Sequence, residues 1–280
     1  MRYPSEIEIE DYIYDHHFEG RCVLPAVEAL ILLAKTVYTN FPNVDLRCLK
    51  KAGFPRFLIL PPDVHHIPVI VGLDHSPDGS VSATLMTSVR SKTGSIGRNL
   101  EHARVEFLPA DSSPNSKLLF PDQEKPERDA FWVPADSIYP GLIPFGKSFQ
   151  NVTGPLSLWP TEASASLSGG ERGPENTPLG SPFSLDAAFH VACIWGQRFT
   201  GLVLFPIGFE KRNIYQRTKK RGVYLGRIFP TGRNQNVFLF DALILDSHGV
   251  VYEEIRGIQM QDVTQGRLQP PPWIKEPRPV

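Results

Sequence analysis

The sequence predicts an α+β protein built from two halves, in each of which an antiparallel sheet surrounds one buried helix. Two long apolar segments, at residues 26–38 and 183–197, are each followed by several short strand-like runs. The chain also contains 27 prolines and 22 glycines, a composition that favours short strands and loops over a helical bundle. With 280 residues, it is long enough for one large domain or two small ones.

Both central helices are predicted from apolar segments that have little polar face. The first, AVEALILLAKTVY, follows Pro25, and a proline is tolerated in the first turn of a helix. The second, FSLDAAFHVACIWGQ, follows Pro182. A helix that is apolar on almost every side is typical of a buried position, so we expect each segment to lie inside its half.

Strands are predicted after each helix from runs rich in β-branched and apolar residues. They lie at residues 56–60, 68–73, 81–89, 103–108, 203–209, 222–229, 237–245 and 250–261. The turn sequences PDGS and DSHG predict two hairpins. Polar, proline-rich or glycine-rich stretches at 109–128 and 168–182 predict loops. We therefore divide the chain into a first unit at 1–110, a linker at 111–130, a second unit at 131–265 and an extended proline-rich tail at 266–280.

Composition excludes several classes of protein. Lys and Arg total 29 and Asp and Glu 30, and this balance argues against a general nucleic-acid binder. The three cysteines show no metal-ligand or disulfide pattern, which indicates a reducing, cytoplasmic setting. The N-terminus has no basic and apolar leader, and Glu28 and Lys35 interrupt the longest apolar run, so we expect neither a signal peptide nor a membrane span.

Other common sites find no support in the sequence. The pair His65-His66 lacks a third ligand at a convincing spacing, so no metal site is predicted. Ser148 does not lie in the G-x-S-x-G sequence of serine hydrolases. Glycine-rich nucleotide-binding motifs are missing as well.

Three short motifs point to chemistry. His16, Gly20 and Pro25 fit H-x-x-x-G-x-x-x-x-P directly before the first apolar segment. Asp186 and His190 fit D-x-x-x-[QH] at the start of the second. The third motif is the run FGKSFQ at residues 145–150.

Together these motifs resemble the dehydratase domains of polyketide synthases and multifunctional fatty-acid synthases. The resemblance extends over most of the chain and includes the run FPIG at 205–208 and the stretch 241–249. It implies a double hotdog fold with the active site between its two halves. It also implies that His16 is the catalytic base and Asp186 the catalytic acid, with supporting substrate or oxyanion positions at Gly20, Pro25, Phe145, Gly146 and His190.

These residue types suit the elimination of water from a 3-hydroxyacyl thioester. The proton α to the thioester needs a positioned base, and a neutral histidine works near pH 7 because its ordinary pKa is ~6.5. The leaving hydroxyl needs a proton, which a carboxylic acid in an apolar cleft can supply because burial raises its pKa. Backbone N–H groups after Gly20 and at the start of the helix after Pro25 would bind the thioester carbonyl.

The resemblance implies a defined reaction and defined partners. The substrate would be carried on the phosphopantetheine of an acyl carrier protein, the product would be the trans 2-enoyl thioester, and no metal or further cofactor would be needed. Other synthase domains are possible partners, and both a monomer and a homodimer remain open. One departure from the family is in the third motif, usually Tyr-Gly-Pro-x-Phe, where Phe145 replaces Tyr and Lys147 replaces Pro. This change removes a hydroxyl that would orient its neighbours.

A basic run, EKRNIYQRTKKRG, has two interpretations. By default it is a solvated loop. The sharper hypothesis is a docking site for the acidic carrier protein or for its phosphate, formed by Lys219, Lys220 and Arg221.

Two other functions stay open beside dehydration. A product-template-like domain would use the same fold and His/Asp pair for the aldol cyclisation of a poly-β-keto chain. A non-catalytic double hotdog would only bind acyl chains, an alternative to which Phe145 and Lys147 lend slight support. The size of the substrate tunnel separates the first two.

Overall fold

The structure is a computed structural model that describes residues 1–90, 97–109 and 130–276. Its main feature is a 12-stranded sheet whose neighbouring strands are all antiparallel. The first half contributes β1 (Arg2–Glu8), β4 (Val44–Gly53), β5 (His66–His75), β6 (Val81–Arg90) and β7 (Gly97–Pro109). The second half contributes β8 (Phe131–Val133), β9 (Leu156–Trp159), β10 (Glu162–Ser168), β11 (Phe205–Ile214), β12 (Val223–Asn234), β13 (Val237–Leu245) and β14 (Val251–Gln261).

The helices and a small hairpin complete the fold. The long helices are α1 (Ala26–Asn40) and α3 (Pro182–Phe199), and the short ones are α2 (Ala135–Gly141) and α4 (Pro272–Lys275). Two 3-10 turns, η1 (Asp11–Asp15) and η4 (Lys147–Phe149), lie near the two-stranded sheet formed by β2 (His17–Phe18) and β3 (Arg21–Cys22).

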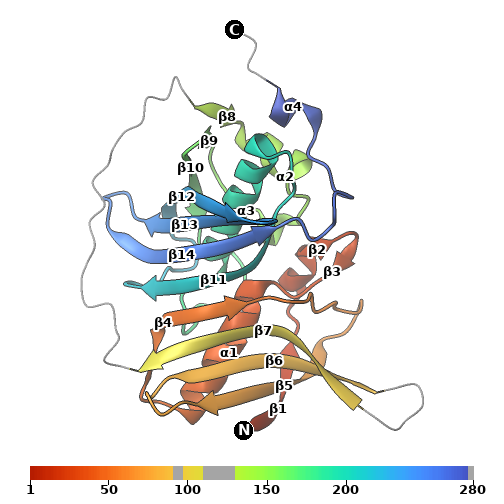
Figure 1. Cartoon of the computed structure of the whole chain (residues 1–280), viewed down its shortest axis with the longest axis vertical. Coiled ribbons are helices and arrows are strands. Elements are labelled where there is room, and N and C mark those ends of the chain that lie inside the picture. The colour runs from red at the N-terminus through yellow and green to blue at the C-terminus, as the bar shows by residue number, and fades with distance from the viewer. Residues whose placement is uncertain (91–96, 110–129, 277–280) are drawn as a thin grey trace.

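The strand order separates the two halves within the continuous sheet. The order is β1-β5-β6-β7-β4-β11-β14-β13-β12-β10-β9-β8, so the halves meet where β4 pairs with β11. Figure 1 shows these two strands side by side in the middle of the molecule, with α1 behind the first half of the sheet and α3 behind the second. The two helices also contact each other. The prediction of an α+β protein with one central helix per half is confirmed.

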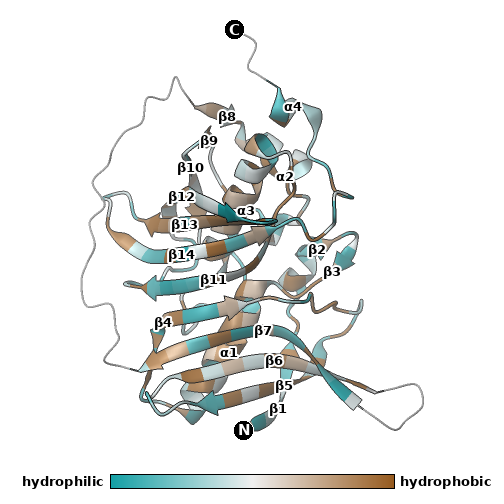
Figure 2. Ribbon diagram, viewed as in Figure 1, coloured by the Kyte–Doolittle hydropathy of each residue, from teal (hydrophilic) through white to brown (hydrophobic). Residues whose placement is uncertain are grey.

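Burial explains why these segments form the core. In β13 the alternate residues Phe238, Phe240, Ala242 and Ile244 are buried, as expected for a strand with one face on a core. Every residue of α3 from Pro182 to Gln197 is buried. Helix α1 is less enclosed than the sequence predicts, because Tyr38 near its end is 60% exposed. Figure 2 shows the ribbon of α1 in mostly apolar colours where it passes behind the first half of the sheet.

A close backbone approach joins the halves at the β4–β11 pair. Gly208 of β11 lies opposite Gly53 of β4. A Cβ atom at position 208 would collide with the carbonyl oxygen of Ala52. Glycine therefore allows β4 and β11 to approach closely where the two halves of the sheet join.

Residues 56–60, which the sequence predicts as a strand, are not one, and the strand is β4 at Val44–Gly53 instead. Prolines at 55, 61 and 62 have no N–H to donate to a ladder. The segment makes only a bridge between Ile59 and Val23, with hydrogen bonds from Leu24 N to Leu58 O (2.9 Å) and from Leu60 N to Cys22 O (2.9 Å).

The expectation of an extended tail is also wrong for the residues that the structure describes. Helix α4 lies in the tail, and its Ile274 is fully buried. Arg198 of α3 donates hydrogen bonds to the carbonyl oxygens of Ile274 and Glu276, both at 2.7 Å. The predicted linker lies outside the described residues except for Ala130, and the proposed unit boundaries stay predictions.

Candidate active site

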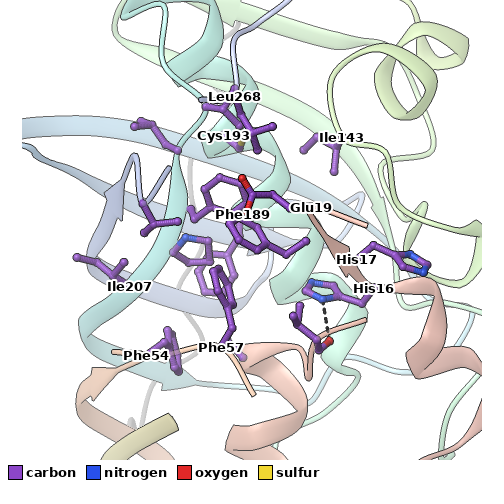
Figure 3. Close-up of a pocket in the computed structure, with 18 of the residues that line it drawn as sticks. His16, His17, Glu19, Phe54, Phe57, Ile143, Phe189, Cys193, Ile207 and Leu268 are labelled. Carbon is purple, nitrogen blue, oxygen red and sulfur yellow. Dashed lines mark hydrogen bonds between the residues drawn. The ribbon is translucent and has the colours of Figure 1, made fainter. Parts of the chain in front are cut away.

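A cavity of about 1190 Å³ lies between the two halves. Residues from both halves of the chain line this cavity, which is the arrangement expected of a site shared by both halves. Figure 3 shows His16 in this pocket, with Phe54 from the first half and Phe189 from the second. The lining residues that the argument uses are His16, Gly20, Ala26, Phe145, Asp186 and His190.

His16 is held by the short segment that follows η1. Its backbone N–H donates to Ile13 O (3.1 Å), and its carbonyl accepts from Val23 N (3.0 Å). The ring nitrogen Nδ1 lies 3.1 Å from Val23 O, the contact dashed in Figure 3. Because a carbonyl oxygen can only accept, Nδ1 must carry the proton, and Nε2 keeps its lone pair.

Burial keeps the His16 ring neutral. It lowers the pKa of His16 to about 4, although the nearby carboxyl group of Asp186 opposes the change. A neutral ring with a free Nε2 is the form that can accept a proton at pH 7.

Two aromatic rings of the second half pack against His16. The ring of Phe145 lies 4.3 Å from that of His16 and 5.1 Å from that of His190, measured between centroids. Phe149 meets the ring of His16 edge-on at 5.1 Å. Phe145 therefore contacts the predicted base and the predicted supporting residue at once, although it lacks the hydroxyl of the family motif.

Asp186 lies in the second turn of α3, and its side chain is buried. Its Oδ2 atom is 3.0 Å from Nε2 of His190, one turn further along the helix. Their orientation does not meet the angular requirements of a hydrogen bond, so neither atom has a hydrogen-bond partner among the described residues. The two groups approach closely, as their i, i+4 spacing predicts.

Gly146 does not line the cavity but holds the residues that do. Its N–H donates to Asp15 O (2.8 Å), and Ser148 N donates to Asp15 Oδ2 (2.9 Å). A Cβ atom at position 146 would collide with the Asp15 carboxylate. Asp15 precedes His16 directly, so these contacts fix the loop of Phe145 relative to the predicted base.

Gly20 and Pro25 shape the first-half side of the cavity. Gly20 has φ +74°, a conformation that glycine adopts easily, and it lines the cavity. Pro25 is the N-cap residue of α1 and does not itself line the cavity, whereas Ala26 does. Among the described residues, the backbone N–H groups of Ala26 and Val27 have no acceptor, as is usual in the first turn of a helix.

The basic residues proposed as a docking site lie elsewhere. Lys219, Lys220 and Arg221 occupy the turn between β11 and β12, and none of them lines the cavity. Lys220 donates to Gly173 O (3.0 Å) and lies 3.4 Å from a carboxylate oxygen of Glu175. Lys219 and Arg221 are exposed.

The basic run is not a uniformly solvated loop, because Arg212 is buried. Its guanidinium pairs with the Glu253 carboxylate at 2.7 Å.

Sequence patterns did not identify two residues that shape the site. Asp15 and Tyr139 contact it across 133 and 51 positions of the chain, respectively. The Tyr139 hydroxyl accepts a hydrogen bond from Val152 N (2.7 Å) and lies 3.4 Å from His190 Nδ1. Only the position of Asp15, directly before His16, offered a signal.

Two further searches cover the described residues. Within residues 1–90, 97–109 and 130–276, no group of three or more His, Cys, Asp or Glu side chains is arranged to hold a metal ion. No helix in the same ranges is both long and apolar enough to cross a bilayer.

Comparisons with known proteins find similarity to polyketide synthase dehydratase domains. Residues 140–270 match the family model described as polyketide synthase dehydratase N-terminal domain. This match includes Asp186 and His190, whereas His16 precedes it. No match was found among curated proteins.

Solved structures share the fold over nearly the whole chain. A trans-AT polyketide synthase dehydratase domain from Brevibacillus brevis has a TM-score of 0.75 at 17% identity, covering 94% of this chain and 93% of that one. The CurJ dehydratase, in its inactive His-to-Phe mutant form, has a TM-score of 0.74 at 18% identity, covering 93% and 90%. A trans-acyltransferase polyketide synthase enoyl-isomerase has a TM-score of 0.68 at 14% identity, covering 92% and 98%. The predicted double hotdog fold is confirmed.

Proposed function

We propose that this chain acts as a polyketide synthase dehydratase domain and removes water from a 3-hydroxyacyl thioester, a proposal supported by its family match over residues 140–270 and by its fold. The substrate is carried on the phosphopantetheine of an acyl carrier protein, and the product is the trans 2-enoyl thioester. One observation carries the proposal: a neutral histidine from the first half and a buried carboxyl group from the second line the same cavity.

The roles of the two residues follow from their surroundings. Nε2 of His16 takes the proton from the carbon next to the thioester carbonyl, since Nδ1 is already bonded to Val23 O. Asp186, in its protonated form, gives a proton to the hydroxyl on the next carbon, which leaves as water. The electron pair of the broken C–H bond becomes the new double bond, so the reaction needs no redox cofactor.

The start of α1 is suited to hold the thioester carbonyl. The N–H groups of Ala26 and Val27 have no acceptor in the described part of the chain, and helix N-termini favour negative charge. A developing enolate oxygen there would receive one or two hydrogen bonds. Gly20 keeps the neighbouring backbone open to the substrate.

A relative supports the role of a histidine. The CurJ dehydratase is inactive after one of its histidines is changed to phenylalanine. By analogy we assign the essential histidine of this chain to His16, the ring with a free Nε2 in the cavity.

The test is a mass assay with matched variants. The protein is incubated with 3-hydroxyacyl thioesters of N-acetylcysteamine and of an acyl carrier protein, and the loss of 18 daltons expected for one water is followed. His16→Ala and Asp186→Asn should abolish this loss while circular dichroism shows a folded protein. His248→Ala, a substitution at an exposed turn, is the control and should stay active. A fully active His16→Ala variant would refute the assignment.

The size of the cavity also suits a second candidate function, the aldol cyclisation of a poly-β-keto chain. The volume of about 1190 Å³ exceeds the ~300–1,000 Å³ of most small-molecule sites, so a long poly-β-keto chain could enter. Such a chain carries ketones in place of a 3-hydroxyl group: His16 would take a proton from a carbon between two carbonyl groups, and the resulting enolate would attack another carbonyl carbon, whose oxygen takes up a proton. Turnover of poly-β-keto thioesters without any turnover of hydroxyacyl thioesters would favour this cyclase, and binding of both without turnover would favour an acyl-binding protein.

We further propose that the exposed residues Lys219 and Arg221 dock the acidic carrier protein, together with Lys220. Charge reversal at Lys219 and Arg221 should slow turnover of the carrier-bound substrate and leave the small thioester unaffected. Equal rates for both substrates in the variant would end this idea. The three free cysteines fit a reducing compartment, and we propose a cytoplasmic location.

A further inference from the structure

The proton on His190 is set by a residue that no sequence motif includes. His190 Nε2 faces Asp186 Oδ2 at 3.0 Å, and both side chains are buried. If Nε2 carried a lone pair, it would either face a lone pair of Oδ2, which is unfavourable in a site with little water, or accept the acidic proton of Asp186 and so turn that proton toward His190. The tautomer of His190 therefore matters for Asp186, and something on the Nδ1 side has to select it.

Tyr139 of α2 lies at that position. Its hydroxyl oxygen accepts a hydrogen bond from Val152 N at 2.7 Å, and the same oxygen is 3.4 Å from His190 Nδ1. Tyr139 is 5% exposed, and burial raises its pKa well above the usual value, so the phenol keeps its single proton at every pH of interest. With Val152 N–H on the oxygen, the phenol proton is free to point at Nδ1.

We propose that Tyr139 is a positioning residue that donates to His190 Nδ1 and thereby places the imidazole proton on Nε2, facing Asp186. This inference rests on the proposed dehydration. An Nε2–H group 3.0 Å from Oδ2, although not aligned for a hydrogen bond in this structure, favours the acidic proton of Asp186 on Oδ1, the oxygen that does not face His190. When that proton passes to the leaving hydroxyl, the Nε2–H group of His190 stabilises the carboxylate that remains.

The surroundings of His190 contain few other titratable groups. Asp186 faces it from its own helix and Tyr139 from α2, and His16 of the first half lies close enough for its protonated form to be repelled by a protonated His190. Phe145 fills the remaining side with an uncharged ring. Phe145 replaces the tyrosine of the family motif, so in this chain the hydroxyl beside His190 comes from Tyr139 instead.

The test compares two tyrosine variants. Tyr139→Phe removes only the hydroxyl, and Tyr224→Phe is the matched control, because Tyr224 is also buried and its hydroxyl also accepts a backbone N–H, from Lys219 at 2.7 Å. Loss of one buried hydrogen bond should lower kcat of Tyr139→Phe by ~10-fold with KM little changed. Both variants should lose similar stability, and Tyr224→Phe should keep the kcat of the wild type.

A double-mutant test separates positioning from a merely structural role. In a His190→Gln background the second substitution, Tyr139→Phe, should lower kcat no further, because no imidazole tautomer remains to be selected. A further drop of kcat in that background, or an unchanged kcat in the single variant Tyr139→Phe, would overturn the proposal.

The tautomer itself can be measured without turnover. Nitrogen NMR shifts of labelled histidine should show His190 with its proton on Nε2 in the wild type and a mixture of tautomers in Tyr139→Phe. A wild-type protein with the proton on Nδ1 would refute the inference even if dehydration is observed. A wild-type protein with the proton on Nε2 but no dehydration would refute the proposed function and leave the Tyr139 contact intact.

Discussion

The two halves share one architecture but hold their polar groups differently. In the second half the buried carboxylates of Glu253 and Glu162 pair with Arg212 at 2.7 Å and with Arg227 at 2.6 Å. In the first half the half-buried carboxyl group on the central helix, Glu28, accepts a hydrogen bond from the Tyr12 hydroxyl at 2.9 Å. No ion pair with Glu28 is found in the described part of the chain.

The same contrast extends to the catalytic candidates. Asp186 lies within α3, a helix whose first sixteen residues are all buried and whose N-cap Ser181 accepts a hydrogen bond from Phe183 N. His16 lies on a short segment before α1, whose N-cap Pro25 offers no side-chain hydrogen bond. The candidate acid thus lies on a buried helix with a side-chain cap, whereas the candidate base is held by backbone contacts.

The largest difference between the halves should appear when ion pairs are broken. Arg212→Met leaves Glu253 as a buried carboxylate without its cation, and we expect stability to fall by about 3–5 kcal/mol in urea unfolding. Lys51→Met breaks the exposed pair with Glu106 in the first half and should hardly move the unfolding midpoint. Similar losses in the two variants would contradict the contrast.

A pH experiment tests the half-buried carboxyl group of the first half. Burial raises the pKa of Glu28 from 4.5 to about 7. Its folded-state pKa thus lies above the unfolded one, so its stabilising contribution is complete below pH 4.5 and is lost as pH rises through about 7. We expect unfolding free energies to fall by up to about 1.4 kcal/mol per pH unit across this window.

Two variants sharpen that result. Glu28→Gln should remove this pH dependence. Above pH 7 the variant should have a higher free energy of unfolding than the wild type. Tyr12→Phe removes the hydrogen bond that lowers the pKa of Glu28, so the fall in stability should move to higher pH. An identical pH dependence in wild type and Glu28→Gln would rule out Glu28 as its source.

The smallest effect is expected at the cap of α3. Ser181→Ala removes the hydroxyl that accepts from Phe183 N and donates to Gly169 O at 2.6 Å. We expect a loss of about 1 kcal/mol, the usual cost of an N-cap, measured from urea midpoints. A loss well above that figure would mean that the contact with Gly169 matters more than the cap itself.

Much of the fold could be predicted because it depends on local patterns. The apolar segments identified α1 and α3, and seven of the eight predicted strands overlap strands of the structure. The strand predicted at 56–60 failed because prolines interrupt the hydrogen-bonding pattern of an apolar run. The short elements β8, β9 and α2 were missed because they carry too little periodicity to be recognised. The longer strands β1, β4 and β10 were missed as well, because charged or small polar residues interrupt their apolar pattern.

What the sequence determined by itself is the identity of the candidate acid and base, because His16 and Asp186 each lie in a motif of fixed spacing beside a helix. The tertiary structure alone brought both residues to one cavity and placed Asp15 and Tyr139 beside them. The physical reason is the distance along the chain over which each interaction acts. Helix periodicity and turn chemistry act over a few residues, whereas the contacts of Asp15 and Tyr139 join residues 133 and 51 positions apart, which meet only in the packed structure.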